Sequence, residues 1–215
     1  MTVSEDVTLR QSYHHGDLRQ ALLTAGIELA REGGPDAVVL REATRRVGVS
    51  PNAAYRHFAD RDALLTAVSD AALAELAASI DSTFDDIPTG DAETVTRAQL
   101  RAVGTAYVAF AQDQPGLFHA AFFVPSDLET SSAPTKAGPS GRSPLELLTE
   151  ALDSLVALGI MPAERRPQAE FLAWSAVHGF ALLVIDGPLR ALPRSQTDAV
   201  TQRVIDMVEA GFTAP

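Results

Sequence analysis

A break between two short helical segments, at Gly48-Val49-Ser50-Pro51, limits the possible folds of this chain more than any other feature. Glycine readily adopts the left-handed backbone conformation that ends many helices. Serine followed by proline is a typical helix start, because serine caps free N–H groups and proline fits the first helical position. The sequence therefore predicts a helix over about 40–47, a tight turn, and a second short helix from Pro51 to about His57.

Longer helical patterns flank this break. Before it, Asp17 is a possible N-cap for a helix that Gly33-Gly34-Pro35 would end. After it, Asp60 can cap a long helix that fades before residues 87–90, which we interpret as the joint between two domains. The apolar residues that recur at helical spacing in these two helices are Leu18, Leu22, Ala25 and Leu29, then Leu64, Leu65, Val68, Ala72 and Leu76.

The stretch from Asp36 to Leu65 therefore has the layout of a helix-turn-helix unit. Two short helices joined by a tight glycine-containing turn, with a preceding helix to brace them, are what docking of a rigid helix in the DNA major groove requires. Helix lengths alone are equally compatible with three short helices that simply form a small core. The choice between these hypotheses depends on the residues themselves.

The rest of the chain also has helical periodicity. We find no convincing strand alternation and no internal repeat, so we expect an all-α protein of about nine helices. Beyond the joint, the expected helices cover about 91–114, 117–123, 145–158, 163–185 and 195–212. Residues 125–144 are rich in Ser, Pro, Gly and Thr and have little to bury, so they are expected to form a mobile loop.

Composition excludes several classes of protein. The chain has no cysteine, so it offers no disulfide and no thiolate metal site. The first residues lack the apolar run of a signal peptide, and no later stretch approaches about 18 apolar residues without a charge or a breaker. We therefore expect a cytoplasmic protein with no membrane partner. The histidines lack metal-site spacing and no nucleophile or phosphate-binding motif is present, so we expect no catalytic residue, no cofactor and no metal.

The distribution of charge matters more than its total of -11. Residues 1–62 contain 8 Arg and 9 Asp or Glu, whereas the remaining residues contain 9 Lys or Arg and 19 Asp or Glu. Within residues 41–62 five arginines outnumber three acidic residues. Because phosphate contacts need cations, a small basic face on an acidic body is compatible with DNA binding confined to that face.

A resemblance to a known family is carried by the string GVSPNAAYRHFADRDALL. It resembles the N-terminal domain of the tetracycline-repressor (TetR) family, in its Gly-Val-Ser turn, its Tyr-x-His-Phe and its Leu-Leu pair. The first helix of that family is similar to YHHGDLRQALLTAGIELAREGG, so the resemblance covers about residues 13–68. It implies a transcriptional regulator, most commonly a repressor, with a DNA-binding domain and N-terminal arm over residues 1–62 and a helical effector-binding and dimerisation domain over residues 63–215.

The resemblance also implies which residues meet double-stranded DNA. Tyr55 and His57 fall where family members touch phosphates, Arg61 falls at the start of the next helix, which also meets the backbone, and Arg41 is a further phosphate candidate. Phe58 is expected to fill the small core instead. The full predicted set is Arg41, Ser50, Asn52, Ala53, Tyr55, Arg56, His57 and Arg61.

Base reading is expected at the start of the recognition helix, which Ser50 begins. There Asn52 can pair with adenine and Ala53 can contact a thymine methyl group, while Arg56 suits a phosphate or a guanine. One departure from the family pattern is Val39, which stands where Ser or Thr usually caps the preceding helix. Loss of that cap costs about 1 kcal/mol of local stability.

In the C-terminal domain the resemblance implies a pocket for a small effector that shifts the protein between DNA-competent and incompetent states. The string WSAVHG resembles the Trp-x-x-x-His-Gly signature of one C-terminal subclass. For Trp174 and His178 we favour packing roles over ligand contact, with His178 bonded to backbone. The candidate lining is Tyr107, Phe110, Phe118, Phe122, Phe123, Trp174 and His178, which favours a largely apolar effector.

Dimerisation is expected because one short recognition helix reads too few base pairs to be specific. The last two helices carry apolar stripes that could pair across a two-fold axis, and a homodimer would read a near-palindromic operator. The candidate interface residues are Phe171, Ser175, Leu182, Ile185, Val200, Val204 and Met207. The alternative function is a helical protein-interaction module that keeps the helix-turn-helix only as scaffold and has no DNA affinity.

Overall fold

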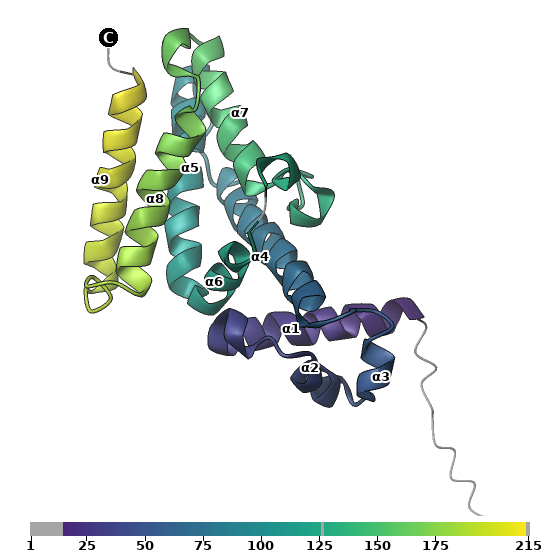
Figure 1. Ribbon diagram of the computed structural model, residues 1–215. Helices are drawn as coiled ribbons and strands as arrows, with labels where there is room; N and C mark the ends of the chain where they lie inside the picture. The colour runs from purple at the N-terminus through teal and green to yellow at the C-terminus, as the bar shows by residue number, and fades with distance from the viewer. Residues whose placement is uncertain (1–14, 126, 214–215) are drawn as a thin grey trace, which may run out of the picture.

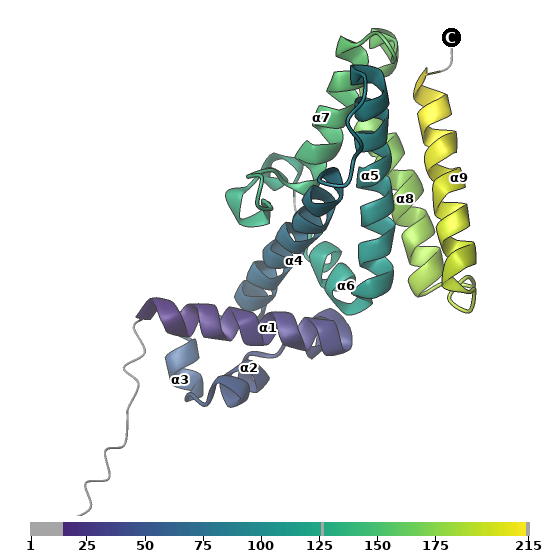
Figure 2. The ribbon, with the colours of Figure 1, turned by 180° about the vertical axis from the view of Figure 1, so that it is seen from behind.

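The structure is a computed structural model that describes residues 15–125 and 127–213. Within these residues it contains helices and no strand, which confirms the all-α prediction, and nine of the helices are α-helices. Figures 1 and 2 show them from two sides. They are α1 (His15–Ala37), α2 (Leu40–Val47), α3 (Pro51–Ala54), α4 (Arg61–Phe84), α5 (Ala92–Asp113), α6 (Pro115–Phe123), α7 (Pro144–Ala157), α8 (Ala169–Ile185) and α9 (Arg194–Thr213). Three short 3-10 helices are η1 (Leu128–Thr130), η2 (Pro134–Lys136) and η3 (Ala163–Arg165).

The first helix ends where its glycines predict. Gly33 and Gly34 have non-helical backbone angles, and Gly34 is left-handed with φ of 68°, so Pro35 begins a separate short turn. At its other end α1 begins at His15. The prediction that Asp17 is its N-cap is therefore wrong, because that residue lies inside the helix.

The helices α1, α2 and α3 form one end of the molecule, and α4 runs from there into the larger helical body (Figure 1). A close approach joins α4 to α1: a methyl group added at Gly26 would come within 2.8 Å of Val68 Cγ2. The small core at this end includes Leu22, Leu64 and Phe58, all buried. The expected core position of Phe58 is thus confirmed.

In the larger body α5 is packed against α4, α6, α7, α8 and α9, so it is the central helix. The helices α8 and α9 pack against each other and lie on the side of α5 away from α4 (Figures 1 and 2). The largest fully buried side chains of this body include Ile80, Phe118, Leu152 and Met161.

One described helix, α4, is long and apolar enough by composition to cross a membrane. Its apolar residues Leu64, Leu65, Leu76 and Ile80 are at most 2% exposed, and α4 packs against α1, α5, α6 and α7. The hydropathy of α4 is therefore that of a helix in the core of this fold.

Candidate nucleic-acid interface and cavity

The turn between α2 and α3 has the geometry that its sequence predicts. Gly48 adopts φ of 76°, and the N–H groups of Gly48 and Val49 both donate to the Thr44 carbonyl, at 2.9 and 3.0 Å. Ser50 is extended and Pro51 is the first residue of α3, but the predicted Ser50 cap is absent, because the serine side chain makes no capping bond. The helix ends at Ala54, earlier than the predicted end near His57, and residues 55–57 continue as a turn.

This short helix presents an outward face. Asn52, Tyr55 and Arg56 are exposed, with Tyr55 56% exposed, whereas Ala53 and His57 are half-buried. On the inner side Ala54 is buried. The structure therefore brings the predicted base-reading and phosphate-binding side chains together at one end of the molecule.

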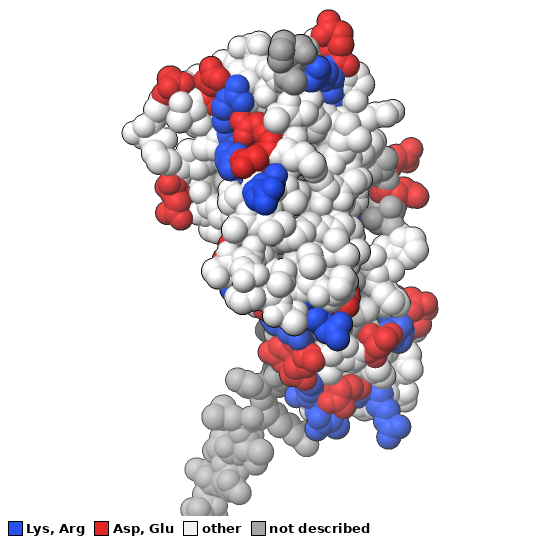
Figure 3. Space-filling model, turned by 90° about the vertical axis from the view of Figure 1, so that its left-hand side faces the viewer, with Lys and Arg blue, Asp and Glu red and all other residues white. Residues whose placement is uncertain are grey.

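The arginines of this region differ in their partners. Arg45 donates to Glu42 at 2.9 and 2.6 Å, and Arg46 donates to Glu32 at 2.9 Å. These hydrogen bonds hold the pKa of both carboxyls below the ordinary value. Figure 3 shows such interleaved blue and red side chains at the lower end of the molecule.

Two exposed arginines have no such partner. Neither Arg41 nor Arg56 lies within 4.0 Å of a carboxylate among the described residues. Arg19, at the start of α1, lies over the ring of Phe58, 5.0 Å from its centre. Arg19 is exposed and was not among the predicted DNA-binding residues.

Arg61 is engaged inside the domain. Its Nε donates to the Val38 carbonyl at 2.9 Å and its Nη2 donates to the Pro35 carbonyl at 2.7 Å. These carbonyls follow the glycine break in α1, so Arg61 ties the start of α4 to the end of α1. Beside it, Asp60 caps α4 by accepting from the Ala63 N–H at 2.8 Å, as predicted. Val39 makes no side-chain cap for α2, also as predicted.

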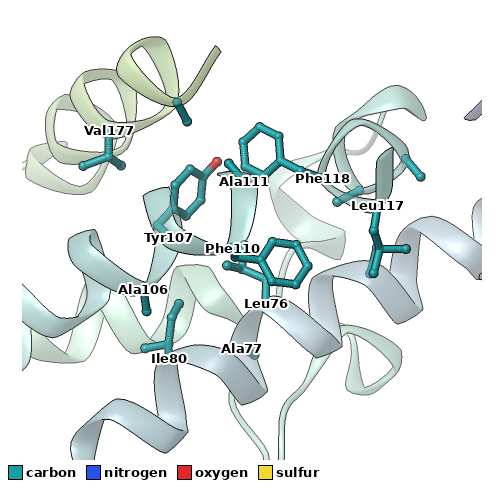
Figure 4. Packing of buried hydrophobic residues seen from close by; sticks show 14 of the residues in the cluster. Leu76, Ala77, Ile80, Ala106, Tyr107, Phe110, Ala111, Leu117, Phe118 and Val177 are labelled. Carbon is teal, nitrogen blue, oxygen red and sulfur yellow. The ribbon is translucent and has the colours of Figure 1, made fainter. Parts of the chain in front are cut away.

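A cavity of about 260 Å³ lies in the larger body, lined by residues of α4 to α9 and of the segment between α6 and α7. Of the seven predicted lining residues, Tyr107, Phe122 and Trp174 contact this cavity. Phe110 and Phe118 are buried in the surrounding core, and Phe123 is 48% exposed. In Figure 4, Tyr107 of α5 lies between Val177 of α8 and Phe118 of α6.

A hydrogen-bonded group joins two of these lining residues to His178, which was predicted to line the cavity but does not. The Trp174 Nε1–H donates to the Tyr107 hydroxyl at 2.9 Å, and that hydroxyl lies 2.7 Å from His178 Nδ1. Because indole nitrogen is only a donor, the tyrosine oxygen accepts from it, whereas the direction of the bond between the hydroxyl and Nδ1 is set by the His178 tautomer. His178 thus bonds to a side chain and not to backbone. Sequence reasoning missed this partnership, because it joins α5 to α8.

Burial favours the neutral form of each titratable member of this group. It lowers the pKa of His178 and raises the pKa of Tyr107. The ring of Phe118 stacks on His178, with the ring centres 5.5 Å apart. These three side chains therefore form a neutral, hydrogen-bonded group in which the Trp174 N–H is already used by Tyr107.

Comparison with known proteins agrees with these features. Residues 22–68 match the family described as bacterial regulatory proteins of the tetR family, and residues 100–208 match a tetracyclin repressor-like C-terminal domain. The chain belongs to the TetR family. Its members are transcriptional regulators, and the two matches cover the helix-turn-helix and the cavity. A search of curated proteins found no match.

Solved structures share this TetR fold. A protein of unknown function from Rhodococcus sp. RHA1 has 26% identity and a TM-score of 0.70, over 94% of this chain and 99% of that one. A regulatory protein of the tetR family from Rhodococcus RHA1 has 19% identity and a TM-score of 0.56, over 92% and 98%. A TetR variant from Acinetobacter baumannii AYE in complex with minocycline has 23% identity and a TM-score of 0.54, over 93% and 96%.

On the face formed by α8 and α9 of this TetR-family protein, charged side chains gather in the upper part and the lower part is largely uncharged (Figure 3). Of the predicted interface residues, Ser175, Leu182 and Met207 are exposed, the last to 64%. Phe171, Ile185, Val200 and Val204 are half-buried. Leu172 and Leu183, which the sequence did not single out, are 64% and 46% exposed on α8.

Proposed function

We propose that this TetR-family regulator is a ligand-responsive repressor that binds a near-palindromic operator as a homodimer and is released by a small, largely apolar effector. The observation that carries the proposal is the exposed face of α3, where Asn52, Tyr55 and Arg56 lie together at the end of the molecule opposite the cavity. We further propose that it acts in the cytoplasm and not as an enzyme, with residues 1–62 as the DNA-binding domain and 63–215 as the effector-binding and dimerisation domain.

In this proposal some of the outward side chains bind phosphates and others contact bases. Tyr55, Arg41 and Arg56 bind phosphates, because both arginines lack carboxylate partners and can release DNA counterions on binding. Asn52 and Ala53, in the first turn of α3, read base edges in the major groove. If Arg56 meets a guanine and not a phosphate, its guanidinium reads that base.

The remaining predicted residues have supporting roles. Ser50 stands just before the exposed start of α3, and His57 adds a phosphate contact beside the helix. Arg61 acts mainly by position, since two of its donors are used by carbonyls at the end of α1. It keeps α4 and α1 at a fixed angle while α3 docks.

A homodimer through α8 and α9 is supported by the exposed apolar side chains of that face. Gly179 and Gly211 have open space where a methyl group would stand, so a second copy can approach the backbone closely there. Leu172, Leu182 and Met207 would be buried by the pairing. Two copies would then present two α3 helices to successive major-groove turns about 34–36 Å apart.

Release by an effector is supported by the contacts of α6. Phe122 of α6 lines the cavity, and the same helix packs closely against α1. A ligand that displaces Phe122 would shift α6 against α1 and so change the separation of the two α3 helices. The Acinetobacter baumannii relative, whose structure contains minocycline, is a precedent for a small molecule bound by this fold.

The test measures DNA binding by the full chain at several salt concentrations, with fluorescence anisotropy as the readout. Arg56→Ala should weaken binding to all sequences by about tenfold and reduce the salt dependence, because one phosphate contact is lost. Arg45→Ala is the matched control, since Glu42 already neutralises this arginine. Equal effects of the two changes, or no DNA affinity in the unchanged protein, would favour the interaction-module alternative.

A further inference from the structure

Lys136 is the one charged residue among the buried residues of the described chain, at 4% exposure. It ends η2, and it lines the cavity. Its Nζ donates to the Thr130 carbonyl at 2.9 Å, while the nearest carboxylate oxygen, Asp70 Oδ1, lies 3.8 Å away. An ammonium group has three N–H donors. Two of them therefore have no hydrogen-bond partner in the described structure.

Asp70 balances the charge of Lys136 without satisfying its donors. The other carboxylate oxygen of Asp70 accepts from the Thr135 hydroxyl at 2.8 Å. A buried ammonium with unsatisfied donors is costly. An acceptor that enters the cavity can recover part of that cost, so the free donors of Lys136 favour a ligand that carries a strong acceptor.

Apart from Tyr107 and Trp174, the polar side chains that line the cavity come from the segment between α6 and α7. Ser131 also lines the cavity, and the contact of its hydroxyl with the Asp127 carbonyl is long, at 3.4 Å. On the α5 and α8 walls, the polar atoms of Tyr107 and Trp174 already bond to each other. The other lining side chains are apolar, among them Leu73, Leu148 and Val208. The cavity therefore has one polar wall and several apolar walls.

We propose that the effector is a hydrophobic monocarboxylate whose carboxylate binds Lys136 and Ser131 and whose apolar body packs against Phe122 and Trp174. This inference rests on the proposed function, because it names the chemical class of the effector. One cation with Asp70 close by suits a single negative charge, since a second charge on the ligand would meet repulsion from Asp70. The volume of about 260 Å³ is below the usual range for ligand pockets, about 300–1,000 Å³, which favours a compact acid.

The experiment uses Trp174, the single tryptophan of the chain, as an internal reporter that lines the cavity. Sodium hexanoate, octanoate, decanoate, benzoate and 4-phenylbutyrate are titrated against the full chain without DNA, and tryptophan fluorescence is recorded. The alcohol, methyl ester and amine of each acid serve as matched probes. At least one acid should bind about tenfold to a hundredfold tighter than its alcohol and ester, the range expected for a charged hydrogen bond. The alkyl and aryl series distinguish the two kinds of monocarboxylate.

Variants of the polar wall sharpen the test. Lys136→Met should remove the preference for acid over alcohol while the alcohol still binds. Asp70→Asn should tighten binding of the acid, because a competing negative charge is removed while an acceptor for Thr135 remains. This second variant keeps Lys136, so it remains informative if Lys136→Met fails to fold. Equal binding of acid, ester and alcohol, no binding of any acid, or an Asp70→Asn protein that binds the acid no tighter than before would overturn the inference.

The design separates this inference from the proposed function. If the acids bind but the protein has no affinity for an operator, the repressor proposal is contradicted and the monocarboxylate proposal is supported. If the protein binds an operator but shows no preference for acids, the monocarboxylate proposal is contradicted and the repressor proposal is supported.

Discussion

Gly116 of α6 lies directly against the backbone of Ala30 in α1: a methyl group added at Gly116 would stand 2.3 Å from the Ala30 carbonyl oxygen. It would also stand 2.9 Å from the Arg31 carbonyl oxygen. Backbone atoms cannot move aside as a flexible side chain can. The two helices that connect the cavity to the DNA-binding end therefore meet at a contact that only glycine fits.

Gly116→Ala should force α6 away from α1. We expect the free energy of unfolding to fall by about 1–3 kcal/mol, as in other overpacked contacts, and operator affinity to fall without any effector. Thermal unfolding and fluorescence anisotropy measure the two effects. Gly90→Ala is the control, because its new methyl group would stand 3.6 Å from Thr94, an ordinary contact. Wild-type stability and affinity in Gly116→Ala would show that this contact does not connect the two ends.

Arg61→Ala should destabilise the protein as well as weaken DNA binding. Two carbonyls at the end of α1 lose their charged donors, which costs about 1–3 kcal/mol. Arg61→Lys should recover only part of this loss, since an ammonium cannot reproduce the planar fork of donors. Chemical denaturation gives the stability. If Arg61→Ala retains wild-type stability and loses only DNA affinity, the side chain is a phosphate contact and not a positioning residue.

The buried His178 makes stability depend on pH. Burial lowers the folded-state pKa below the ordinary value of 6.5, so the unfolded chain binds the proton more readily. Stability contributed by neutral His178 should be fully present above pH 6.5 and should be lost as the pH falls through 6.5 toward the lower folded pKa. Between about pH 8 and pH 5 the melting temperature should fall less steeply with decreasing pH in His178→Gln than in the wild type. Parallel curves for the two proteins would contradict this role.

The α8–α9 face should determine the oligomeric state. Met207→Glu combined with Leu172→Glu places two charges on side chains that are each 64% exposed in one copy, so the isolated chain should tolerate them. Light scattering should then report a monomer where the wild type is a dimer. Ala92→Glu, in the exposed first turn of α5, is the control and should remain dimeric. A wild-type protein that stays monomeric at all concentrations would refute the dimer.

Val39→Ser should stabilise the protein. Val39 has the extended backbone of an N-cap but makes no capping bond, and it is 42% exposed. A serine hydroxyl there can accept from the first free N–H groups of α2, which is worth about 1 kcal/mol, or about 2–4 °C in melting temperature for a protein of this size. Val39→Ala removes the same side chain without supplying the cap, so it should not show the gain.

Local chemistry explains what could be predicted from the sequence. Gly48, Pro51 and Asp60 act within one turn of helix, so their roles as helix end, helix start and cap follow from neighbouring residues alone. The apolar periodicity likewise predicted the long helices. The family resemblance then placed Asn52 and Tyr55 on the outward face.

What could not be predicted depends on contacts between distant residues. Arg61 meets carbonyls more than 20 positions earlier, and Tyr107 meets Trp174 and His178 about 70 positions later. Lys136 lies in a segment whose composition predicts a mobile loop, yet it is buried against α4. The spacing of apolar residues along the sequence does not predict contacts between such distant residues. The mobility of residues 125–144, the subclass suggested by Trp174–Gly179 and the roles of the individual site residues remain predictions.

Reading of DNA by paired α3 helices can be tested by selecting the sequences that this chain binds from a random DNA pool. We expect enriched sites with two-fold symmetry and half-site centres about 34–36 Å apart, or a multiple of that turn. Asn52→Ala should relax the preference at one base position in each half-site. A pool with no enrichment, or with enriched sites that lack symmetry, would contradict reading by paired α3 helices.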